Sequence, residues 1–252
     1  MPSGLACPMN RSPLELHRRR PLVVGSIGSG EVLAGLDPAD VASACDVVEI
    51  RLDLLSAKER QARGWRVFEK IPLLFTARRA SEGGAGDLSA EQREAMLIDV
   101  IAEAAAIDIE VASIPEMAGL RIKLHDAGVP WIASFHDFRG VPDLALLHAS
   151  RENARNSGAA AFKAAFELGW QLDSLPALAQ FVAGSDFPTS LMGMGPFAPM
   201  SRVMFAQLGS VLNYGYLGDT PTAPGQWSAR QLREAIASVS CSATYDPTPA
   251  DQ

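Results

Sequence analysis

Short apolar runs alternate with helical patterns along almost the whole chain, and this alternation limits the fold more than any other feature. "PLVVGSI" (21–27), "DVVEIRL" (46–52) and "VPWIASF" (129–135) have the length and composition of buried strands. Between such runs, stretches like "SAEQREAMLIDVIAEAAA" (89–106) repeat apolar residues every three or four positions, as amphipathic helices do. About eight strand–helix repeats follow one another, which predicts parallel strands joined by crossover helices.

We therefore predict an α/β protein consisting of a single (β/α)8 TIM barrel over residues 21–239. Residues 1–20 are predicted to be a poorly ordered N-terminal tail and 240–252 a C-terminal tail. Both are too short for a second domain. The segment "GSIGSGEVLAG" after the first strand matches neither the dinucleotide fingerprint nor the Walker loop, which argues against a fold that binds NAD or ATP.

Charge and cysteine content exclude several classes of protein. The formal net charge of −7 argues against binding to nucleic acid or to an anionic membrane surface. No stretch reaches membrane-spanning length. The three cysteines, Cys7, Cys45 and Cys241, have neither disulfide-framework nor zinc-site spacing. The apolar run after "HRRR" is short for a signal peptide, so a reducing, cytoplasmic location is expected.

Polar residues at the ends of the predicted strands are the candidates for chemistry, because a (β/α)8 barrel carries its reactive groups there. Glu49, Arg51 and Asp53 alternate in "VEIRLD", which suggests that they share one face. Charges inside a barrel must be paired or must bind something polar. An internal salt-bridge network and a binding site are both open readings of this motif.

Lys163 and His136 are the most informative of these residues. Lys163 alone among the four lysines has apolar neighbours in sequence, "AFKAA", and a desolvated amine is a possible nucleophile for a ketone. The other reading is a lysine that reaches solvent from a strand end. His136 follows a strand and could act as a general base. The remaining histidines form no cluster with it, so no metal site is predicted.

Two segments resemble mobile loops at the mouth of the barrel. "RRASEGGAGD" carries Glu82, and "LGDTPTAPGQW" carries Thr222 and Gln226. Loops of this kind exclude water from a barrel site, although simple surface turns would have the same composition.

The chain resembles the type I 3-dehydroquinate dehydratases from about residue 21 to residue 239. The resemblance rests on "VEIRLD", "PLLFTARRASEGG", "DIE", "SFHDF", "FKAA", "MSR" and "APGQW", in this order. It implies a TIM barrel, usually dimeric, that uses neither a metal nor an organic cofactor. The implied reaction converts 3-dehydroquinate to 3-dehydroshikimate and water.

The resemblance also implies a role for each candidate residue. Lys163 would form a Schiff base with the ketone, His136 would be the general acid and base, and Glu82 would orient His136. The substrate carboxylate would be held by Arg202, Thr222 and Gln226. The ring hydroxyls would contact Glu49, Arg51 and Arg78, and the ring would pack on Met192 and Met194.

Some positions depart from the family. Thr222 stands where many members have Ser, and Gly25 lies near a position where some have Ser, so one polar contact with the substrate is expected to be missing. "MGMGPFAP" replaces a segment that is often more polar. Two alternatives remain open: an imine-forming barrel like the class I aldolases, and a catalytically silent relative that binds metabolites.

Overall fold

The computed structural model describes residues 14–18, 20–169, 172–223 and 225–240. Eight parallel strands are hydrogen-bonded in the order β7-β6-β5-β4-β3-β2-β1-β8. The strands are β1 (Leu22–Ile27), β2 (Val47–Arg51), β3 (Leu73–Thr76), β4 (Ala106–Glu110), β5 (Trp131–Asp137), β6 (Ala161–Glu167), β7 (Thr189–Met194) and β8 (Leu212–Tyr216). The ends of this sheet meet where the backbone N–H of Val211 donates to the carbonyl of Thr189 at 3.1 Å. The predicted (β/α)8 barrel is thereby confirmed.

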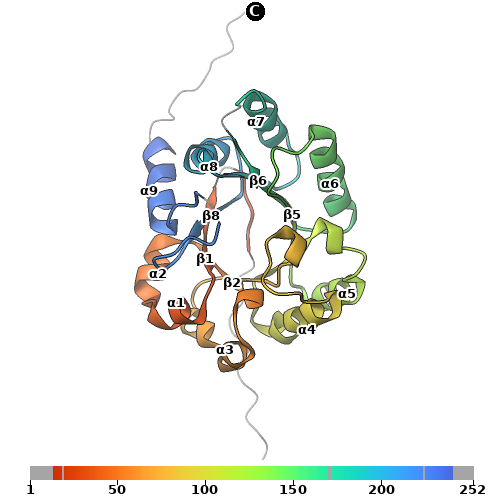
Figure 1. Ribbon diagram of the computed structural model, residues 1–252, viewed down its shortest axis with the longest axis vertical. Coiled ribbons are helices and arrows are strands. Elements are labelled where there is room, and N and C mark those ends of the chain that lie inside the picture. The colour runs from red at the N-terminus through yellow and green to blue at the C-terminus, as the bar shows by residue number, and fades with distance from the viewer. Residues whose placement is uncertain (1–13, 19, 170–171, 224, 241–252) are drawn as a thin grey trace, which may run out of the picture.

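Helices surround the strands on the outside (Figure 1). They are α1 (Gly30–Gly35), α2 (Pro38–Ala44), α3 (Ala57–Ala62), α4 (Ala90–Val100), α5 (Ala118–Ala127), α6 (Leu144–Asn156), α7 (Leu175–Ala183), α8 (Ala198–Gln207) and α9 (Ala229–Ser240). Short 3-10 turns follow three of the strands, namely η1 (Leu52–Leu54), η3 (Ala80–Glu82) and η5 (Val111–Ser113), and two of the helices, namely η2 (Gly64–Phe68) and η4 (Ile101–Glu103). None of the helices within the described residues has the length and apolar character needed to cross a bilayer.

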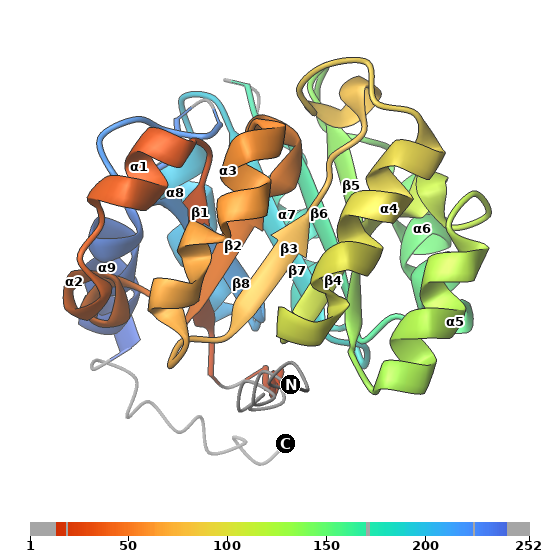
Figure 2. The same ribbon diagram turned by 90° about the horizontal axis from the view of Figure 1, so that it is seen from below.

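Local sequence signals set where the helices begin. Asp37 caps α2, whose first residue is Pro38. Ser89 and Gln92 form the predicted capping box at the start of α4, which satisfies two backbone groups reciprocally. The loops after the strands consequently start and stop at defined residues, and they gather along one edge of the barrel (Figure 2).

The barrel interior changes from apolar to polar along its axis. Its lower part is filled by side chains that include Val24, Leu74 and Ile132. A second, larger apolar cluster lies between the strands and the surrounding helices. Higher in the barrel the alternate strands β2, β4, β6 and β8 contribute one layer of four side chains, Glu49, Asp108, Lys163 and Tyr214. Two of these four side chains are carboxylic acids and one is an amine, so this layer forms the floor of a reactive site.

The tails predicted from the sequence are only partly visible. Leu14 and Leu16 pack against the apolar cluster inside the barrel. Residues 1–13 and 241–252 of these tails lie outside the described residues, as do Cys7 and Cys241. Cys45 is buried, and burial raises the pKa of its thiol to about 12.

Candidate active site

One pocket at the carboxyl ends of the strands brings together the eleven side chains to which the family resemblance assigned a role, whereas Asp53 is not part of its lining. These side chains are Glu49, Arg51, Arg78, Glu82, His136, Lys163, Met192, Met194, Arg202, Thr222 and Gln226. Ser26, Phe138 and Tyr214 line the same pocket and were not among the predicted site residues. Because these residues come from nearly every part of the chain, only the closed barrel places them within reach of one another.

The surroundings of the Lys163 amine correct the expectation of an apolar environment. The residues next to Lys163 in β6 are apolar, and Lys163 itself is 4% exposed. Its Nζ, however, donates to Oδ2 of Asp108 at 3.1 Å and lies 3.9 Å from Oε1 of Glu49. Residues that are distant in sequence supply both carboxylates. A cation at this position is therefore compensated electrostatically, whether it is an ammonium or an iminium.

Glu49 is held from two neighbouring strands. Ser26 Oγ donates to its Oε2 at 2.6 Å and Thr76 Oγ1 donates to its Oε1 at 2.8 Å. Ser26 also lines the pocket. The residue after Gly25 in β1 thus places a hydroxyl in the pocket, while the loss of a substrate contact at Gly25 stays a prediction.

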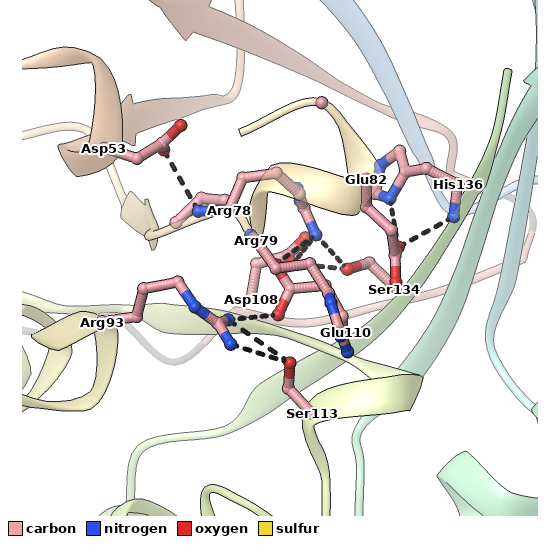
Figure 3. A network of polar contacts seen from close by, with 12 residues as sticks. Asp53, Arg78, Arg79, Glu82, Arg93, Asp108, Glu110, Ser113, Ser134 and His136 are labelled. Carbon is pink, nitrogen blue, oxygen red and sulfur yellow. Dashed lines mark hydrogen bonds and ion pairs between the residues drawn. The ribbon is translucent and has the colours of Figure 1, made fainter. Parts of the chain in front are cut away.

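His136 at the end of β5 is oriented by Glu82 of η3 (Figure 3). Oε2 of Glu82 accepts from the backbone N–H of His136 at 3.0 Å and lies 3.0 Å from Nδ1. Burial, with Arg78 and Lys163 nearby, lowers the pKa of His136 well below 6.5. A neutral imidazole that donates from Nδ1 to Glu82 leaves Nε2 as a proton acceptor. Burial raises the pKa of Glu82 to about 7.

The loop that carries Glu82 is anchored by buried carboxylates. Asp53 accepts from the backbone N–H groups of Arg78 and Ala85, each at 3.1 Å, and so holds both ends of the loop. It also pairs with Arg51 at 2.7 Å. The predicted alignment of Asp53 with Glu49 along a strand is wrong, because β2 ends at Arg51 and Asp53 belongs to η1. The salt-bridge reading holds for Arg51 and Asp53.

Arg78 lies in a fully paired network (Figure 3). Its Nη1 is 2.9 Å from Oδ1 of Asp108 and 3.2 Å from Oε1 of Glu110. Burial alone would lower the pKa of this guanidinium, but Asp108 and Glu110 raise it above its ordinary value. Glu110 is paired further with Arg93 of α4 at 2.9 Å. Arg93 was not among the predicted site residues, because it lies within a helix and is far in sequence from any strand end.

Arg202 of α8 has the opposite surroundings. It is 2% exposed, and its guanidinium donates only to backbone carbonyls, of Tyr214 at 2.6 Å and of Gly193 at 3.3 Å. No acidic side chain within the described part of the chain pairs with it, and its Nε has no partner there. Burial lowers its pKa to about 10. A buried cation without an acidic partner is electrostatically uncompensated, and an anion in the pocket would compensate it.

Thr222 and Gln226 belong to the loop that closes this side of the pocket. The backbone N–H and the hydroxyl of Thr222 both donate to Oε1 of Gln226, at 3.0 and 2.8 Å. Met192 and Met194 of β7 supply apolar surface to the same pocket. Across the structure's described residues, no group of three or more acidic, His or Cys side chains is arranged to hold a metal ion.

These features define an enzyme of the (β/α)8 class whose pocket joins a buried amine, an oriented neutral imidazole and a buried arginine without an acidic partner among the described residues. The family profile described as Type I 3-dehydroquinase matches residues 29–241. The chain belongs to this family.

Individual members of the family are similar in sequence to this chain over most of their length. The chain is 35% identical over 222 residues to a 3-dehydroquinate dehydratase of Methanothrix thermoacetophila, covering 88% of this chain and 93% of that protein. It is 30% identical over 213 residues to a 3-dehydroquinate dehydratase of Haloquadratum walsbyi, covering 79% of this chain and 86% of that protein. A 3-dehydroquinate dehydratase structure from Geobacillus kaustophilus covers 94% of this chain and 100% of that one, with 22% identity and a TM-score of 0.76, which supports the fold.

Proposed function

We propose that this chain dehydrates 3-dehydroquinate to 3-dehydroshikimate and water through a Schiff base on Lys163, with His136 as the general acid and base. Membership of the type I 3-dehydroquinase family supports the substrate and the reaction. The observation that carries the mechanism is the pocket shared by the buried amine of Lys163 and the neutral imidazole of His136.

The imine makes a C–H bond acidic. Nζ gives one proton to His136 and attacks the ketone carbon, and the carbonyl oxygen leaves as water with that proton and a second one from Nζ. The resulting iminium is compensated by Asp108 and Glu49, which lie beside Nζ. Nε2 of His136 then takes a proton from the carbon next to the iminium, and the C–H electron pair moves into the ring to form an enamine.

The enamine expels the hydroxyl group from the next carbon. The C–O bond breaks as the protonated His136 returns its proton to the departing oxygen, so water leaves and the conjugated iminium forms. Hydrolysis by a water molecule releases the product ketone and regenerates Lys163. Glu82, which contacts Nδ1, keeps the imidazole oriented through both proton transfers.

The other pocket residues would hold the substrate. Arg202, with Thr222 and Gln226 on the adjoining loop, is proposed to bind the carboxylate, because it is a buried cation without an acidic partner in the described residues. Glu49, Arg51 and Arg78 would contact ring hydroxyls, and Met192 and Met194 would pack on the ring. A homodimer and a cytoplasmic location remain predictions from the sequence.

Borohydride trapping tests this mechanism. The protein is incubated with 3-dehydroquinate, reduced with borohydride, and digested for peptide mass spectrometry. We expect a substrate- or product-derived adduct on Lys163, and no adduct or turnover in Lys163→Ala. Lys123→Ala, which changes an exposed lysine of α5, is the matched control and should behave as wild type.

Other outcomes would identify the alternatives. Normal turnover by Lys163→Ala would exclude the proposed mechanism. An adduct followed by products of C–C cleavage would indicate chemistry like that of the class I aldolases. Tight binding of 3-dehydroquinate without turnover would indicate a silent metabolite-binding relative.

A further inference from the structure

We propose that Tyr214 is a further catalytic residue of this site: its hydroxyl donates a hydrogen bond to the oxygen on the substrate carbon that bonds to Lys163. This inference rests on the proposed function and adds a donor that stabilises the oxygen while the imine forms. The resemblance to the family assigns no role to this position, and the placement of the side chain leads to the proposal.

Tyr214 faces the reacting nitrogen directly. It lies in β8, completes the polar layer with Glu49, Asp108 and Lys163, and lines the pocket. Nζ of Lys163 is 4.0 Å from the centroid of its ring, a distance at which the π face attracts a cation. The hydroxyl is attached to the rim of this ring. An oxygen on the carbon that bonds to Nζ therefore comes close to it.

The hydroxyl of Tyr214 differs from the other polar groups of its layer. Glu49 accepts from Ser26 and Thr76, and Asp108 accepts from Ser134 and Lys163. The Tyr214 hydroxyl is buried and has no hydrogen-bond partner among the residues that the structure describes. A buried hydroxyl without a partner costs free energy, and Tyr214 is one of the residues that line the pocket. A ligand oxygen there would remove that cost.

The hydroxyl is suited to donate a hydrogen bond without giving up its proton. Burial raises the pKa of Tyr214 well above 10, and the nearby Glu49 and Asp108 carboxylates raise it further. The hydroxyl thus stays protonated during the reaction. Donors fixed in a water-poor site stabilise a developing oxyanion more than water does.

Nζ gives a proton to His136 and attacks the ketone carbon, so the N–C bond forms and the C=O π pair moves to the oxygen. The Tyr214 O–H donates a hydrogen bond to this alkoxide, which then takes a proton from the attached nitrogen. The protonated His136 gives its proton to the resulting hydroxyl, the C–O bond breaks, water leaves, and the nitrogen lone pair forms the C=N bond.

Tyr214→Phe tests the role, because it removes the hydroxyl and keeps the ring over Lys163. The rate of adduct formation on Lys163 is measured by mixing with saturating 3-dehydroquinate and quenching with borohydride at set times. We expect Tyr214→Phe to form the adduct about 10- to 100-fold more slowly than wild type. Tyr216→Phe, the same change two residues further along β8 and outside the pocket lining, should leave the rate unchanged.

Thermal unfolding of the free protein gives an independent readout. Removing a buried hydroxyl that lacks a partner should leave the Tm of Tyr214→Phe unchanged or raise it. A Tm several degrees lower would show that the hydroxyl is already bonded in the free protein and would overturn the proposal, as would an adduct rate within twofold of wild type. If wild type itself forms no adduct, the proposed function has failed rather than the role of Tyr214.

Discussion

Arg78 and Arg202 are two buried arginines of one pocket with opposite surroundings. Arg78 follows β3 and is paired with Asp108 and Glu110, whereas Arg202 belongs to α8, after β7, and contacts only backbone carbonyls among the described residues. The carboxylates raise the pKa of Arg78, while burial lowers that of Arg202 to about 10. The charge of Arg78 is balanced in the free protein. The charge of Arg202 has no acidic partner among the described residues, so we expect Arg78 to contribute more to stability and Arg202 more to ligand binding.

The largest effect should come from removing the paired arginine. Arg78→Met leaves Asp108 and Glu110 buried with fewer partners, so we expect the free energy of unfolding to fall by about 3–5 kcal/mol. Denaturant unfolding measures it. Arg139→Met, which removes an arginine whose side chain is 90% exposed, is the control and should change stability by less than about 1 kcal/mol. Equal losses in the two variants would contradict the assignment of Arg78 to a buried network.

Removing the unpaired arginine should affect ligand binding instead. In Arg202→Met, substrate binding should weaken by about 2–4 kcal/mol, because the carboxylate loses a buried charged donor. The stability of the free protein should stay the same or increase, since an uncompensated cation is gone. Steady-state kinetics and thermal unfolding of the same preparation separate the two effects. An unchanged KM would show that the carboxylate is held elsewhere.

Glu82 lies between these extremes, because its charge is buried and only partly compensated. Its pKa of about 7 lies above the ordinary value of 4.5, so the folded protein holds this proton more tightly than the unfolded chain. The stability from this group is fully present below pH 4.5 and is lost as the pH rises through about 7. Glu82→Gln should therefore raise the Tm relative to wild type more at pH 8 than at pH 5.

The same substitution should change the pH dependence of catalysis. In wild type, kcat/KM should fall below about pH 7, as Glu82 takes up a proton and no longer accepts from Nδ1 as a carboxylate. Glu82→Gln should lower kcat by about 10- to 100-fold and remove this acidic decline. An unaltered pH profile in the variant would assign the decline to another group.

The smallest effect is expected at Thr222, on the loop beside Arg202. Thr222→Ser keeps the hydroxyl that donates to Gln226, so the change in KM should correspond to less than about 1 kcal/mol of binding free energy. Thr222→Ala loses this hydrogen bond and should raise KM more, by an amount that corresponds to about 1 kcal/mol of binding free energy. Measured KM values in the reverse order would show that the methyl group, rather than the hydroxyl, matters for the loop.

The barrel and the positions of most site residues were predictable from the sequence. Alternating strand and helix patterns define parallel strands, and parallel strands place their carboxyl ends at one edge. That rule brought His136 and Lys163 to the same side of the molecule before any contact was known. The roles of Glu82 and Arg202 came from the family resemblance, because a glutamate in a loop or an arginine in a helix has no distinctive local pattern.

What only the tertiary structure decided is which charged groups are paired. The local sequences of Arg78 and Arg202 do not show which of the two is paired, and Lys163 has apolar neighbours along β6 although its Nζ lies beside two carboxylates. Tyr214 and Asp53 likewise gain their significance from contacts with distant residues. Strand register and barrel closure determine these contacts, and both depend on packing over the whole chain. Local sequence therefore determined where reactive groups would stand, while the folded barrel determined their electrostatic state.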